Sequence, residues 1–201
     1  MKIILACSVF LFSLGAFANK PTCFEEKKEM VIPQTKFTLT TRGEISNGTQ
    51  KFANLPLPKG FVGECLIATP IKSDILVILS LDAQDYDKKN AFVFRISNKD
   101  SKVIWSQLIK NPVEPYLPFI NEKVIIVPTV GEAIAINPEM GGIRWRFGST
   151  EVDTVDFKRF SINGAVVTAE GTSLVAGKST NNKYELNVWD GILLPPKNLA
   201  P

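Results

Sequence analysis

The sequence predicts an all-β protein built from repeated four-stranded antiparallel sheets. Short runs rich in Val, Ile, Phe and Thr alternate with clusters of Gly, Asn, Asp and Pro, the pattern of strands separated by turns. No long stretch shows the 3.6-residue period of an amphipathic helix. Ten runs are the best strand candidates: 36–42, 74–81, 91–97, 102–109, 123–130, 132–137, 143–149, 164–170, 173–179 and 183–189.

An internal repeat narrows the choice among all-β folds. Three segments share one order: a short first strand, an apolar strand, another strand, a turn, and a strand with a tryptophan. Trp105, Trp145 and Trp189 lie 40 and 44 residues apart, which is the period of a four-stranded propeller blade. We therefore expect a propeller-like array of about three to four antiparallel blades, with the tryptophans as buried anchors. An open blade stack or a β-sandwich stays an alternative, because propellers usually close with four to eight blades.

The middle unit, AIAINPEMGGIRWRF, resembles the repeat of quinoprotein-like (PQQ-type) β-propellers. In that repeat an Ala-x-Asp-x-x-Thr-Gly-x-x-x-Trp pattern turns the chain between the last two strands of a blade. Ala135, Gly141 and Trp145 match the pattern, whereas Asn137 stands where the pattern has Asp and Met140 where it has Thr. The first unit keeps the spacing through Trp105 but has Arg95 in place of Ala. Turn chemistry agrees with the resemblance, because glycine takes the positive φ that a tight hairpin needs.

The N-terminus predicts export. Lys2 precedes an apolar run, and Ala16-Phe17-Ala18 has the small-x-small pattern of a signal-peptidase site. The run is shorter than the roughly 20 residues that span a bilayer. We expect residues 1–18 to be a signal peptide cleaved near Ala18, leaving a secreted or periplasmic chain without an integral membrane span. Residues 19–65 are expected to form an N-terminal arm and a degenerate β unit, and residues 66–201 three propeller-type repeats, in one compact domain.

Cysteine usage fits the same compartment. Cys7 leaves with the predicted signal peptide, so Cys23 and Cys65 remain as an even pair in an exported chain. We expect a disulfide that ties the N-terminal arm to the body and stabilises the fold by roughly 3–4 kcal/mol. Two separate thiols are the alternative.

Composition excludes several functional classes. The chain has 23 Lys and Arg against 20 Asp and Glu, and this small, interspersed excess does not indicate nucleic-acid binding. It contains no histidine, which excludes Ser-His-Asp, Cys-His and His-zinc chemistry. The sequence therefore assigns no catalytic, cofactor-binding or metal-ligating residue, and no cofactor.

Three polar clusters have an ordinary interpretation beside a functional one. The loop at 82–90 offers oxygen ligands for calcium but lacks the glycine and glutamate of a calcium loop, so we interpret it as a solvated hairpin tip. Acidic residues within 151–156 are best explained as a solvated connection. Arg144 and Arg146 could bind an anion, but strand alternation puts Trp145 on the opposite face from both.

These observations favour a non-enzymatic protein-binding or scaffold module in the cell envelope or outside the cell. The resemblance supports this expectation, because the quinoprotein-like family includes an envelope-assembly subunit that holds protein partners. We expect the partner, another protein, at loops at the ends of the sheets or at an exposed strand edge. The alternatives are a small-ligand-binding protein and a degenerate relative of quinone-dependent enzymes, whose adjacent-cysteine pair is absent here.

Overall fold

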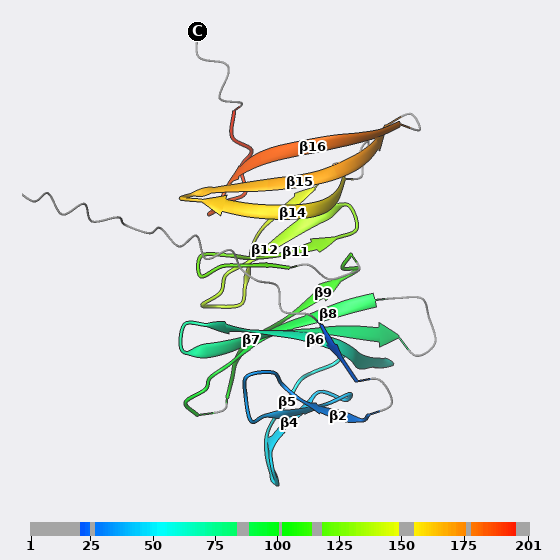
Figure 1. The fold of residues 1–201 in the computed structure, drawn as a ribbon, viewed down its shortest axis with the longest axis vertical. Helices are drawn as coiled ribbons and strands as arrows, with labels where there is room; N and C mark the ends of the chain where they lie inside the picture. Colours follow the sequence, from blue (N-terminus) through cyan, green and yellow to red (C-terminus); the bar gives the residue numbers. More distant parts are fainter. Residues whose placement is uncertain are drawn as a thin grey trace, which may run out of the picture.

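The computed structural model describes residues 21–24, 27–83, 89–100, 102–113, 118–148, 155–175 and 178–195. These residues form sixteen strands in four antiparallel sheets. Figure 1 shows the sheets lying one on another along the long axis, with β2, β4 and β5 at one end and β14, β15 and β16 at the other. The prediction of an all-β, propeller-like array is confirmed, in the form of an open stack. The predicted signal peptide lies outside the described residues.

We number the sheets by their order in the stack. The first sheet has the order β2-β3-β4-β5, and the second has the order β1-β6-β7-β8-β9. The strands of the first sheet are β2 (Glu29–Val31), β3 (Thr38–Thr40), β4 (Glu44–Asn47) and β5 (Gln50–Asn54). The strands of the second sheet are β1 (Thr22–Cys23), β6 (Phe61–Ile71), β7 (Asp74–Ala83), β8 (Lys89–Ile96) and β9 (Val103–Lys110). The second sheet thus begins inside the segment assigned to the N-terminal unit.

The other two sheets complete the stack. The third sheet has the order β10-β11-β12-β13, and the fourth has the order β14-β15-β16. The strands of the third sheet are β10 (Phe119–Ile120), β11 (Ile125–Thr129), β12 (Glu132–Ile136) and β13 (Ile143–Gly148). The strands of the fourth sheet are β14 (Val155–Asn163), β15 (Val166–Val175) and β16 (Lys178–Asn187). No helix in this described part of the chain has the length and apolar character needed to cross a membrane.

Each inner sheet buries both faces. In β7, Ile75, Val77 and Leu79 pack toward the first sheet, while Leu76 and Ile78 pack toward the third. This division follows from the two-residue period of a strand, since successive side chains point to opposite faces. A continuous apolar run is therefore the sequence of a strand covered on both sides.

The run VIIV at 124–127 obeys the same rule. Val124 and Ile126 belong to the core shared with the fourth sheet, and Ile125 and Val127 to the core shared with the second. All four side chains are buried. An apolar run of this kind predicts a strand that neighbouring blades cover on both faces, and the structure confirms it.

The N-terminal arm is joined to the second sheet as expected. In β1, Cys23 lies opposite Cys65 of β6, and the two form a disulfide with an S–S length of 2.04 Å. The chain then leaves β1 and forms the first sheet before it returns as β6. The predicted disulfide is therefore present, and it closes the loop that contains the first sheet.

The third predicted repeat differs from the structure. The sequence indicated turns at 171–172 and 180–182, yet both segments lie inside strands, where Gly171 pairs with Asn182. The glycine serves a close backbone approach instead of a turn, because a Cβ at position 171 would come within 2.7 Å of the Asp156 carbonyl oxygen. β15 and β16 consequently form one long hairpin of ten-residue strands.

Candidate functional site

The second and third sheets are joined by a tryptophan of the second sheet whose ring packs against a turn of the third. Trp105 of β9 is 9% exposed, and its Nε1 donates a hydrogen bond of 3.0 Å to the Pro138 carbonyl. Beneath the indole lies Gly141, with φ of 73°. A Cβ there would come within 2.4 Å of the Trp105 ring. Glycine is required at this position both by the positive φ and by the close contact of the ring.

The third and fourth sheets are joined in the same way. Trp145 of β13 is 6% exposed, and its Nε1 donates a hydrogen bond of 3.0 Å to the Val188 carbonyl. Gly191, with φ of 71°, lies beneath it, and a Cβ there would come within 2.8 Å of the ring. One anchor geometry therefore occurs at two junctions of the stack.

The two turns that receive these tryptophans are equivalent. Asn137 N donates to Gly142 O at 2.9 Å, and Gly141 N donates to Asn137 O at 2.8 Å. The second turn repeats both bonds, because Asn187 N donates to Ile192 O and Gly191 N to Asn187 O, each at 2.9 Å. In this alignment Trp189 corresponds to Glu139, and not to Trp105 or Trp145.

Trp189 is thus not the third buried anchor that the spacing predicted. It lies on the turn that receives Trp145, and 54% of its surface is exposed. The reason is the long β15–β16 hairpin. Trp189 follows β16, which is the third strand of its sheet, whereas the sequence predicted Trp189 within a fourth strand. Spacing alone therefore aligned Trp189 with two tryptophans whose structural role it does not share.

The fourth sheet has a free edge along β16. In the described residues, only the segment 192–194 pairs with the outer side of this strand: Leu193 bridges to Leu186, and Leu194 N donates to Glu185 O at 2.7 Å. The outer side of β16 from Lys178 to Lys183 has no described strand beside it. The sequence between these two lysines, Ser-Thr-Asn-Asn, contains neither a charge nor a proline.

Such an edge contrasts with the edge of the third sheet. Natural sheets protect exposed edges with charges, prolines, bulges or short strands. β13 has six residues and carries Arg144 and Arg146, whereas β16 has ten residues and an uncharged stretch. Within the described part of the chain, the outer backbone groups of β16 between Lys178 and Lys183 therefore have no strand beside them and can pair with an added strand.

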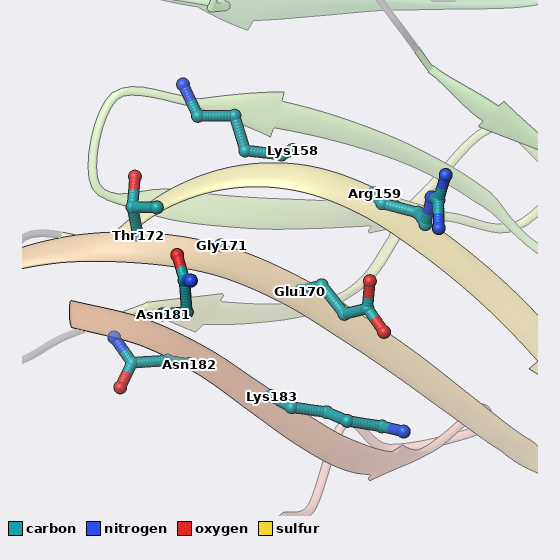
Figure 2. Close-up of a pocket in the computed structure, with 8 residues that line it drawn as sticks. All are labelled: Lys158, Arg159, Glu170, Gly171, Thr172, Asn181, Asn182 and Lys183. Atoms are coloured by element: carbon teal, nitrogen blue, oxygen red, sulfur yellow. The ribbon is translucent and has the colours of Figure 1, made fainter.

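A cleft of about 550 Å³ lies over the strands of the fourth sheet beside this edge. Arg159, Glu170 and Lys183 form a cross-strand row on β14, β15 and β16. Eight residues line the cleft: Lys158, Arg159, Glu170, Gly171, Thr172, Asn181, Asn182 and Lys183. In Figure 2 their polar ends spread along the three strands and do not converge on one point. This arrangement suits an extended segment better than a small molecule.

A buried charge network lies at the junction of the second and third sheets. Arg95 is 6% exposed, and its Nη2 lies 2.6 Å from Asp74 Oδ2. Its Nη1 donates to the Pro138 carbonyl at 3.0 Å and to Glu139 Oε2 at 3.1 Å. Lys72 also pairs with Glu139. The network links β7 and β8 to the turn that receives the first tryptophan.

Electrostatics within this network favour the charged forms. Burial is the largest influence on Arg95 and lowers its pKa, but the hydrogen bonds and charges of Asp74 and Glu139 together outweigh burial and leave the pKa raised. Hydrogen bonds from Lys72 and then Arg95 lower the pKa of Glu139. The sequence had one signal of the network, a charged residue inside the apolar run FVFRI.

In each of the other two polar clusters, one described acidic residue forms an ion pair with a lysine. Asp156 Oδ2 lies 2.5 Å from Lys158 Nζ, and Asp82 Oδ1 lies 3.2 Å from Lys89 Nζ. The rest of the 151–156 cluster and the centre of the 82–90 loop lie outside the described residues. No group of three or more possible metal-ligating side chains occurs in the part of the chain that the structure covers.

The two arginines of β13 have separate environments. Arg146 Nη1 lies 2.5 Å from Glu132 Oε1. Arg144 donates to the Lys123 carbonyl at 2.8 Å, and its Cζ lies 4.9 Å from the centroid of the Trp189 ring. Arg144 therefore meets a tryptophan of the next sheet, and not its neighbour Trp145.

No family model and no curated protein matches the chain. Among solved structures, the crystal structure of BamB from Moraxella catarrhalis is similar to the chain, with a TM-score of 0.30 and 10% identity over 88% of this chain and 77% of that chain.

Proposed function

We propose that the chain is an exported, non-enzymatic protein-binding module that holds an extended segment of a protein partner at the free edge of β16. The observation that carries the proposal is the open side of the fourth sheet from Lys178 to Lys183. Six residues match an ordinary strand, which has about five or six. Each main-chain hydrogen bond to an added strand contributes about 0.5–1.5 kcal/mol, whatever the side chains are.

The direction of the backbone groups on β16 supports this proposal. Asn187 N and Glu185 O bond to the segment 192–194 on the outer side. Hydrogen-bonding groups of successive residues alternate between the two sides of a strand, and the β15–β16 register is unbroken. The N–H and C=O groups of Ser179, Asn181 and Lys183 consequently face the free edge.

The arrangement of the charged side chains supports the non-enzymatic part of the proposal. The buried acid Asp74 is held by Arg95, and the side chains around the cleft spread apart. A catalytic site instead brings groups with shifted pKa values within reach of one reacting atom. Export is supported by the Cys23–Cys65 disulfide, because such bonds persist in oxidising compartments.

The test uses Asn181→Pro, which removes one outward N–H while leaving the β15–β16 ladder intact. The mature protein is used as bait for cell-envelope and culture-fluid proteins of its source organism. We expect the wild type and the matched control Asn181→Ala to retain one stoichiometric protein, and Asn181→Pro to retain about tenfold less or none.

Two results would contradict the proposal. Equal retention by the proline variant, with an unchanged thermal midpoint, would place the partner away from the β16 edge. If neither the wild type nor the alanine control retains a protein, the binding-module proposal is wrong. Native mass spectrometry of the isolated protein would then test the small-ligand alternative.

A further inference from the structure

A second surface of the fourth sheet lies on the turn beyond β16. Trp189 is 54% exposed, Ile192 63% and Leu193 54%. Single exposed apolar residues are ordinary, but three large ones within five positions are an unusual concentration of exposed apolar side chains. We call this group, together with Arg144, the turn patch.

The backbone that carries Trp189 is fixed. Val188 on one side is fully buried and accepts the hydrogen bond from Trp145 Nε1, and Gly191 on the other side lies under the Trp145 ring. The Asn187 side chain accepts a hydrogen bond from Trp189 N at 2.9 Å. An exposed aromatic on such a constrained turn is preorganised, so binding through it loses little conformational entropy.

Arg144 adds a charge to the turn patch. Its guanidinium lies over the Trp189 ring, in the geometry of a cation–π contact. Arg95 and Arg146 each pair with a carboxylate, whereas no carboxylate lies within 4 Å of the Arg144 guanidinium in the described residues. Its single described hydrogen bond goes to the Lys123 carbonyl. Donors on this group remain for a ligand.

We propose that the turn patch binds a partner segment in which an Asp or Glu lies within two residues of a large apolar side chain. The carboxylate pairs with Arg144, and the apolar side chain packs on Trp189, Ile192 and Leu193. Trp and Arg are among the residues that most often dominate binding energy at protein interfaces. This inference rests on the proposed binding function but uses a surface separate from the β16 edge.

The experiment uses a display library of random twelve-residue peptides selected on the wild-type protein and counter-selected on Trp189→Ala. We expect enrichment of sequences with an acidic residue within two positions of a large apolar one. A synthetic peptide of the enriched sequence should bind Trp189→Ala about thirtyfold more weakly and Arg144→Gln about tenfold more weakly than the wild type.

Controls separate the turn patch from general effects. Trp189→Phe keeps an aromatic surface and should retain most of the affinity, and Ile104→Ala removes an exposed apolar side chain of β9 and should retain all of it. The proposal is overturned if no acidic and apolar pattern is enriched, or if Trp189→Ala binds the synthetic peptide as tightly as the wild-type protein does. A folding defect is distinguished by the thermal midpoint.

The same variants distinguish the two proposals with the captured protein partner. Loss with Asn181→Pro but not with Trp189→Ala would leave the β16 edge as the binding site and overturn the turn patch. Loss with Trp189→Ala but not with Asn181→Pro would support the turn patch and contradict the edge.

Discussion

The junction between the second and third sheets differs from the junction between the third and fourth, although both are built on one anchor. Each has a tryptophan Nε1 that donates to a turn carbonyl, at 3.0 Å in both cases, and a glycine under the ring. The first junction adds a buried ion pair between Arg95 and Asp74. The second adds an aromatic cluster that includes Phe147, Phe157 and Tyr184.

The difference is sharpest at one position of the turn. Both side chains are about half exposed, but Glu139 pairs with Arg95 and Lys72 of the second sheet, whereas the corresponding Trp189 lies against Arg144 of the third. The strand position that pairs with Glu139 at one junction also differs at the other, because Ala135 of the third sheet corresponds to Arg95 of the second. Main-chain geometry is thus the constant part of the repeat, whereas the side chain at this turn position differs between the two turns.

Removing an anchor should have the largest effect. Trp105→Ala and Trp145→Ala each leave a cavity and remove one hydrogen bond from a turn carbonyl, and each should lower the free energy of unfolding by about 3–5 kcal/mol. Denaturant titration measures this. Trp189→Ala is the matched control and should change it by no more than about 0.5 kcal/mol, because the side chain is largely exposed. A similar loss in all three variants would refute the distinction between anchors and the turn residue.

Breaking the ion pair between Arg95 and Asp74 should destabilise only the junction between the second and third sheets. Asp74→Ala leaves Arg95 buried with a weaker set of partners and should cost about 3 kcal/mol of unfolding free energy. Replacing both residues, Asp74→Leu with Arg95→Met, should recover part of this loss, because no charge then remains buried. A double variant less stable than Asp74→Ala would contradict the interpretation.

Gly141→Ala tests the close approach of the indole. The variant combines backbone strain at positive φ with a Cβ that collides with the Trp105 ring, so we expect a loss of about 2–3 kcal/mol. Gly48→Ala isolates the strain, because Gly48 has φ of 61° and open space around its Cβ position. That control should lose only about 1 kcal/mol. Equal losses would show that ring contact adds nothing.

The smallest expected effect is on the pH dependence of the free energy of unfolding. The folded pKa of Glu139 lies below its ordinary value near 4.5, first because of the Lys72 hydrogen bond and then because of Arg95. Its stabilisation is therefore present above the unfolded pKa and is lost as pH falls through the folded pKa. The group is half exposed, so the effect should stay below about 1 kcal/mol.

Thermal midpoints measured from neutral to acidic pH check this prediction. Glu139→Gln should have a shallower decline in acid than the wild type, and Lys72→Met an intermediate one. An unchanged acid profile in Glu139→Gln would exclude a contribution of this carboxylate.

Much of the fold could be predicted because period-2 alternation records burial directly. The run at 124–127 predicted its two-sided packing, and Cys23 and Cys65 predicted their pairing. The fourth sheet could not be predicted equally well, since Gly171 looks like a turn residue in sequence but serves a bulge in the neighbouring strand. Trp189 was misaligned for the same reason, because spacing does not record which backbone groups pair. The free edge of β16 follows from strand register alone and had no local signal.

The disulfide has a consequence for the order in which parts of the molecule open. Cys23 and Cys65 are 42 positions apart, and β2, β3, β4 and β5 all lie between them. The first sheet is therefore a tethered loop whose two ends are fastened to the second sheet at one point. When this sheet detaches in a local fluctuation, the disulfide keeps it close to the second sheet, so that it re-docks quickly. After reduction of the bond, the same fluctuation releases the N-terminal end of the chain. Hydrogen exchange of this sheet should accordingly respond to reductant before the exchange of the other three sheets does.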